Sequence, residues 1–127
     1  MVYPHANTLL SVPTNTTANQ TGTTFIVVAR DEVDPIQAAV AITASQSDGA
    51  SSPTVSVICE TSADGVNWVE AHKVDLSSTT TATELEVVTI LGPYVRARSV
   101  LGGGTRPNHN CKVSLLTTEP IQLLVKA

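Results

Sequence analysis

The sequence predicts an all-β chain, an antiparallel β-sandwich that is jelly-roll-like, with eight or nine strands and an extended N-terminal arm. Ser and Thr together make up nearly a quarter of the 127 residues, and Val dominates the apolar ones. No run of helical length has Ala, Leu, Glu, Lys and Arg at the helical period. From residue 23 onward, short apolar runs are separated by turn residues, which is typical of antiparallel sheets.

Each expected strand is a short apolar or alternating run between turn residues. The expected strands cover residues 24–30, 36–44, 54–61, 67–72, 84–91, 94–101, 112–117 and 121–126. In the third run, alternation places Val55, Val57 and Cys59 on the core face. The chain has the length of one ordinary domain, so we expect a single sandwich domain over residues 23–127.

The first 22 residues differ from the rest in being rich in Thr, Asn and Pro. Their only apolar cluster is Leu9, Leu10 and Val12. Such a segment has too little apolar surface to order itself, so it is either mobile or laid across its own domain or a partner. We therefore predict an extended arm over residues 1–22, with these three side chains as candidate interface residues.

The charge and composition exclude several functions. A net charge of -4 lacks the basic excess that nucleic-acid binding requires. Aromatic residues make up only 3% of the chain, whereas stacking platforms present several rings together. No apolar run approaches the length of a membrane span, and the first residues do not resemble a signal peptide. We expect a protein made in the cytoplasm that binds neither nucleic acid nor membrane.

No pattern of residues predicts catalysis, a metal or a cofactor. His5, His72 and His109 are scattered, and His109 with Cys111 makes only two of the ligands a zinc site needs. No nucleophile-elbow motif accompanies any Ser. Cys59 and Cys111 are too far apart in sequence to indicate a disulfide framework, and reduced core residues are the simpler interpretation.

Two charged pairs lie on predicted strands. Glu84 and Glu86 alternate onto one strand face. A solvated outer face is a simpler interpretation of this pattern than a pair of catalytic acids for glycoside hydrolysis. Arg96 and Arg98 share a face with Tyr94, either balanced by the two glutamates or forming a protein interface. The further candidate interface residues are Tyr94, Arg96, Arg98 and Arg106.

A tight hairpin is predicted at Asp64 and Gly65, which tolerate the positive φ that such turns need. Trp68 follows it as the one large side chain of the hairpin, and we expect it to be buried.

Segment 53–68, with the motif Ser62-x-Asp64-Gly65-x-x-Trp68, resembles a recurring hairpin of small β-sandwich virion proteins of tailed bacteriophages. Segment 91–96, followed by a glycine-rich bend and a terminal strand pair, is similar to the second half of that pattern. The resemblance implies a non-enzymatic capsid decoration (cement) protein on the virion surface. Such a protein forms a homo-oligomer, often a trimer, and its partner is the major capsid protein.

The same hairpin is also similar to that of discoidin-type galactose-binding-like domains, where it belongs to the framework. That similarity implies a carbohydrate-binding module that uses loops at one end of the sandwich, over residues 45–53 and 102–110. A tail or neck adaptor of a virion is a third alternative, which the sequence does not separate from decoration.

Overall fold

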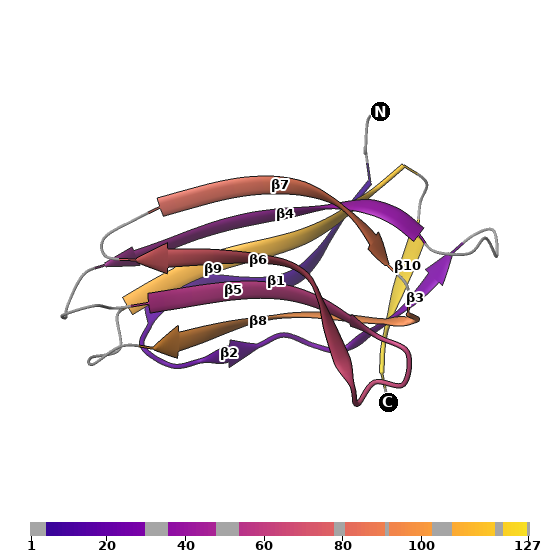
Figure 1. The fold of residues 1–127 in the computed structure, drawn as a ribbon, viewed down its shortest axis with the longest axis horizontal. Coiled ribbons are helices and arrows are strands. Elements are labelled where there is room, and N and C mark those ends of the chain that lie inside the picture. The colour runs from indigo at the N-terminus through magenta and orange to yellow at the C-terminus, as the bar shows by residue number, and fades with distance from the viewer. Residues whose placement is uncertain are drawn as a thin grey trace.

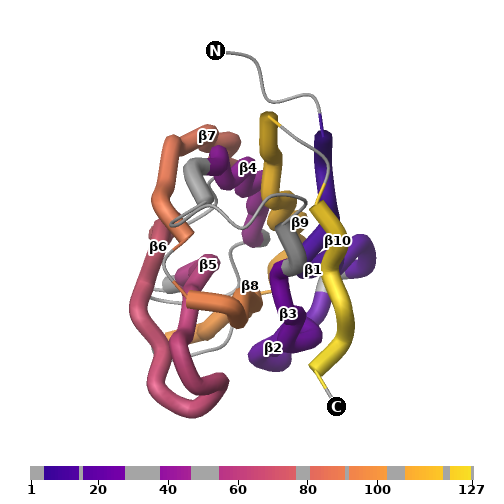
Figure 2. Tube along the Cα trace, turned by 90° about the vertical axis from the view of Figure 1, so that its right-hand side faces the viewer, coloured from indigo at the N-terminus to yellow at the C-terminus, as the bar shows by residue number. Residues whose placement is uncertain are grey.

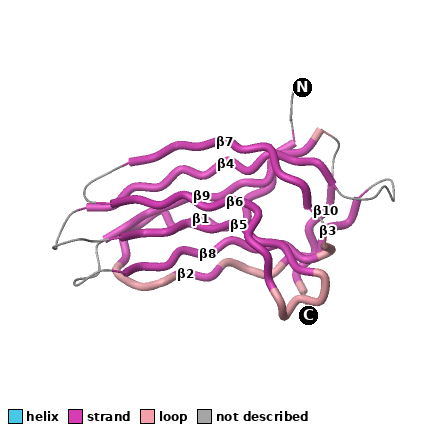
Figure 3. The backbone as a smooth tube through the Cα atoms, in the orientation of Figure 1, coloured by secondary structure: helices cyan, strands magenta, loops and turns pink. Residues whose placement is uncertain are grey.

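The computed structural model describes residues 5–29, 36–47, 54–77, 81–90, 92–102, 108–118 and 121–126. Over these residues the chain forms ten strands and no helix (Figures 1 and 3). The strands are β1 (His5–Thr16), β2 (Gln20–Thr21), β3 (Phe25–Ala29), β4 (Ile36–Ser47), β5 (Thr54–Ser62), β6 (Trp68–Ser77), β7 (Thr81–Ile90), β8 (Tyr94–Gly102), β9 (Asn108–Thr117) and β10 (Ile121–Val125). The eight predicted runs coincide with β3 to β10, although β4, β6, β7 and β9 are longer than expected.

The strands form two antiparallel sheets packed as a sandwich. Figure 2 shows the strands from one end of the molecule. Sheet A has the order β1-β9-β4-β7, and sheet B has the order β10-β3-β8-β5-β6 with β2 beside β8. The pairs nest around the β5–β6 hairpin, since β4 pairs with β7, β3 with β8 and β1 with β9. This nested pairing across two sheets is that of a jelly roll, so the predicted fold class is confirmed.

The core lies between the sheets and is aliphatic. Alternation along the strands directs one set of side chains into this core. In strand β8, for example, buried and half-buried residues alternate along the whole strand. Val55, Val57 and Cys59 are fully buried, as predicted. Cys59 and Cys111 are free thiols, and burial raises the pKa of Cys59 to about 12 and that of Cys111 to about 11. Both therefore remain protonated and inert at neutral pH.

The segment expected as an arm forms β1 and β2 of the sandwich. Strand β1 pairs with β9 along most of its length, and Leu9, Leu10 and Val12 are buried in the chain's own core. Their prediction as interface residues is therefore wrong. The physical reason is a register shift between Thr8 and Leu10, which lets two adjacent leucines both reach the core.

Trp68 is not the buried core side chain that the sequence suggested. It pairs with Ser62 across β5 and β6, is half-buried, and lies outside the aliphatic core. The hairpin is as expected and Gly65 has a positive φ of 78°, but residues 63–67 join β5 to β6, so the turn is longer than the tight one predicted. Backbone amides of Asn67 and Val66 donate to the Asp64 carboxylate and hold its pKa well below its usual range. This carboxylate therefore serves the turn itself.

Candidate binding surfaces

The outer face of sheet B carries a cluster of charged and aromatic side chains. Tyr94, Arg96 and Arg98 lie at alternate positions of β8 and share its outward face. In the register of β5 against β8, Ser62 is opposite Tyr94 and Glu60 is opposite Arg96. The alternation of β8 thus brings together three of the predicted interface residues, whereas Arg106 lies outside the described residues.

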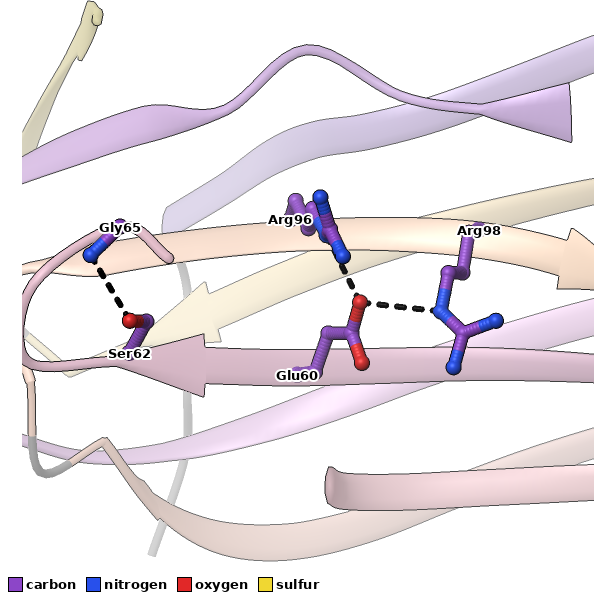
Figure 4. Close-up of polar contacts among 5 residues, drawn as sticks. All are labelled: Glu60, Ser62, Gly65, Arg96 and Arg98. Atoms are coloured by element: carbon purple, nitrogen blue, oxygen red, sulfur yellow. Dashed lines mark hydrogen bonds and ion pairs between the residues drawn. The ribbon is translucent and has the colours of Figure 1, made fainter. Parts of the chain in front are cut away.

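Glu60 is the carboxylate that pairs with both arginines. Arg96 donates from Nε to Glu60 Oε1 at 2.7 Å, and Arg98 donates from Nε to the same oxygen at 3.0 Å (Figure 4). The Glu60 side chain is only 5% exposed although it points away from the core, because the guanidinium groups lie against it. Sequence reasoning missed Glu60, whose only signal is that it is the one charged residue of β5.

Trp68 completes this cluster. The Arg96 guanidinium lies over the Trp68 ring, 4.1 Å from its centroid, in cation–π geometry. We call Glu60, Trp68, Arg96 and Arg98 the Trp-Arg cluster. A second cation lies nearby, because Lys126 Nζ is 5.8 Å from the centre of the Tyr94 ring.

The predicted pairing of the arginines with Glu84 and Glu86 is wrong, because these glutamates belong to β7 in the other sheet. In register they are opposite Ile42 and Val40, so they project on the inward side of an edge strand. They are nevertheless exposed, since the edge is open. His72 Nε2 lies 3.1 Å from Glu84 Oε1, and this contact links β6 to β7 across the side of the sandwich.

The outer face of sheet A is apolar and uncharged at its centre. Ala39 is in register with Val87 and Leu116, and Ala41 is in register with Leu85 and Ser114. Leu85 is 66% exposed and Val87 is 53% exposed. We call Ala39, Ala41, Leu85, Val87, Ser114 and Leu116 the sheet A patch. Sequence reasoning missed this patch because it placed Glu84 and Glu86 on the outer face, whereas the register puts Leu85 and Val87 there.

A Ser–His pair does occur, but it is enclosed. Ser99 Oγ lies 2.8 Å from His109 Nε2, and His109 Nδ1 lies 3.0 Å from the Thr16 carbonyl oxygen. Both side chains are buried, and the third partner is a carbonyl where a catalytic triad has an acid. Burial lowers the pKa of His109. The pair is a buried polar contact that joins β8 of one sheet to β9 of the other.

The other sequence candidates do not gather. His5, His72 and His109 lie on three different strands, β1, β6 and β9. Within the described ranges, no three His, Cys, Asp or Glu side chains are grouped so as to hold a metal ion. None of the described residues forms a helix long and apolar enough to cross a membrane. Most of the two loops considered for carbohydrate lies outside the described residues.

Comparison of the chain with protein-family models, with curated proteins and with solved structures gives no match.

Proposed function

We propose that this chain is a non-enzymatic structural protein of a tailed-bacteriophage virion, namely a capsid decoration protein. It would oligomerise and bind the outer surface of the shell, with the major capsid protein as its partner. The observation that supports this proposal best is the sheet A patch, where Leu85 and Val87, on the outward side of edge strand β7, are more than half exposed. Exposed apolar surface with polar surroundings is typical of protein contacts.

A second copy of the chain is the occupant that the sheet A patch favours. The chain has a net charge of -4, so repulsion between two copies is smallest where the surfaces that meet carry no charge. The patch has no charged residue, and the small side chains of Ala39 and Ala41 allow two faces to approach closely. Apolar surface of this kind is enriched at contacts between identical subunits.

The fold and the hairpin motif give further support. Jelly rolls are common in viral capsid and lectin domains, although fold alone does not decide function. The carbohydrate alternative is weaker here, because one face of the Trp68 ring is already covered by Arg96. A sugar that stacked on this face would first have to displace the guanidinium.

The test is quantitative mass spectrometry of purified particles from the source culture. It measures the copy ratio of this chain to the major shell protein. One copy per shell subunit is expected for a decoration protein. A ratio lower by more than an order of magnitude points to a tail or neck adaptor, and absence from the particles contradicts a virion role.

A further inference from the structure

We propose that the Trp-Arg cluster binds a carboxylate that an acidic segment of a partner polypeptide presents. This site lies on sheet B, away from the sheet A patch, and the inference does not depend on a virion role. It rests on the hydrogen-bond donors that the cluster leaves free, on its charge, and on the way its side chains are held.

The free donors are the terminal Nη groups of both arginines. Each guanidinium gives its Nε–H to the same oxygen of Glu60, and within the described residues neither makes another hydrogen bond. Figure 4 shows the guanidinium group of Arg98 extending beyond the carboxylate. The side chains of Arg96 and Arg98 are 25% and 34% exposed, so their outer edges are accessible to solvent. A planar carboxylate is the group that such donors bind best.

The cluster is also held in place before any ligand arrives. Glu60 is buried and fixes the Nε end of both arginines. Trp68 lies against the Arg96 guanidinium and limits its rotation. Arginines that are already ordered lose less conformational entropy on binding than free surface side chains do. This order distinguishes the cluster from a chance pair of surface arginines.

The charge of the cluster selects an acidic partner. Two guanidinium groups and one carboxylate leave one positive charge on a chain whose net charge is -4. Glu70 is the register partner of Glu60 on β6 and is exposed, and it makes no ion pair with a described residue. It borders the site and opposes an incoming carboxylate, so its removal should strengthen binding.

A polypeptide fits this site better than an acidic glycan. Glycan sites commonly stack a sugar ring on an aromatic face. Here the Arg96 guanidinium already covers one face of the Trp68 ring, so a sugar cannot stack there without displacing it. The cluster lies on the outer surface of strands β8, β5 and β6, where another protein surface can approach. The proposed ligand is therefore an Asp or Glu side chain on a partner segment.

The experiment measures binding of a fluorescein-labelled oligoglutamate peptide to the full chain by fluorescence anisotropy, with an oligoglutamine peptide as the neutral control. We expect binding of the acidic peptide alone, weakening as salt is added. Arg98→Gln should weaken it about fivefold, the upper range for an exposed ion pair. Lys112→Gln removes the same charge from an exposed position on sheet A and should leave the affinity unchanged. Glu70→Gln should tighten binding.

Several outcomes would overturn the inference. One is no binding of the acidic peptide by the unaltered chain, and another is an equal loss in Arg98→Gln and Lys112→Gln, which indicates a response to net charge. Tighter binding of an oligogalacturonate of the same length would assign the site to a glycan. If Arg98→Gln fails to fold, Glu70→Gln decides, because it alters only an exposed side chain. The assay contains no virion, so its result and that of the particle analysis are independent.

Discussion

Glu60 shows how one buried carboxylate organises the outer face of a sheet. It lies between two guanidinium groups, and its loss would leave them with no opposite charge between them. A buried charged group that has hydrogen-bonded partners is costly to remove, because those partners keep their desolvation penalty. The arginines are partly exposed, so water offsets some of this cost.

Glu60→Gln keeps the shape of the side chain but removes its charge. We expect it to lower the free energy of unfolding by about 1–3 kcal/mol. Urea denaturation followed by circular dichroism measures this. The matched control is Glu86→Gln, which alters an exposed carboxylate without an ion pair in the described ranges and should change stability by less than about 0.5 kcal/mol. Equal effects of the two substitutions would contradict the role given to Glu60.

His109 predicts a specific dependence of stability on pH. Its two contacts fit the neutral ring, in which Nδ1–H donates to the Thr16 carbonyl and Nε2 accepts from the Ser99 hydroxyl. Burial lowers its pKa in the folded chain. The unfolded chain, with a His pKa of about 6.5, therefore takes up a proton first as the pH falls. This group leaves stability unchanged above that pH and reduces it below.

The measurement is urea unfolding of the wild type and of His109→Gln at several pH values from about 8 to about 5. Glutamine can replace both hydrogen bonds but does not titrate. We expect the free-energy difference between the two proteins to be constant above about pH 6.5 and to shift in favour of the variant below it. A difference that stays constant over the whole range would show that His109 is protonated equally in both states.

At the scale of elements, strand β1 is what the sequence failed to predict. The strands from β3 onward could be predicted because each is a short apolar or alternating run between turn residues. The run of Leu9, Leu10 and Val12 does not alternate, and only the bulge beside Leu9 makes it core-forming. A bulge depends on the partner strand, and β9 lies about a hundred residues away in the sequence.

The same limit applies to the Trp-Arg cluster. Alternation along β8 was enough to place Tyr94, Arg96 and Arg98 on one face. It could not identify Glu60 as their partner, because that requires knowing that β5 lies beside β8. Trp68 was assigned to the core by its size, whereas its register opposite Ser62 puts it on the outer face.

The position of β1 gives a sharp prediction for a truncated chain. Deletion of residues 1–22 removes three buried aliphatic side chains, each contributing about 1.5–3 kcal/mol. That sum is comparable to the whole stability of a small domain, about 5–15 kcal/mol. We expect the truncated chain to lose its cooperative thermal transition, measured by circular dichroism. Deletion of residues 1–4 alone, which leaves β1 whole, should retain it. A folded chain without residues 1–22 would mean that β1 is dispensable.

At the scale of the whole molecule, sheet A favours contact with a partner through the side chains of its outer face and disfavours main-chain pairing at its edges. Both of its edge strands carry features that disfavour pairing with another chain. Strand β7 has Glu84 and Glu86 on its inward side, and β1 contains Pro13 and two register shifts. The uncharged sheet A patch lies on the face and extends onto β7, whose Leu85 and Val87 are its most exposed side chains, whereas Ala39 is only 1% exposed. Association of copies is therefore expected through side chains of this face.

Leu85→Glu tests this contact. The new carboxylate would lie between two copies of the chain, opposite either the same carboxylate of the second copy or apolar side chains. The matched control is Val69→Glu, since Val69 and Leu85 are each 66% exposed but Val69 lies on β6 of the other sheet. Sedimentation equilibrium over a range of concentrations should give an oligomer for the wild type and for Val69→Glu. The Leu85→Glu chain should be folded but monomeric. A wild type that is monomeric at every concentration would exclude self-association through the sheet A patch, and so would an oligomer that Leu85→Glu leaves intact.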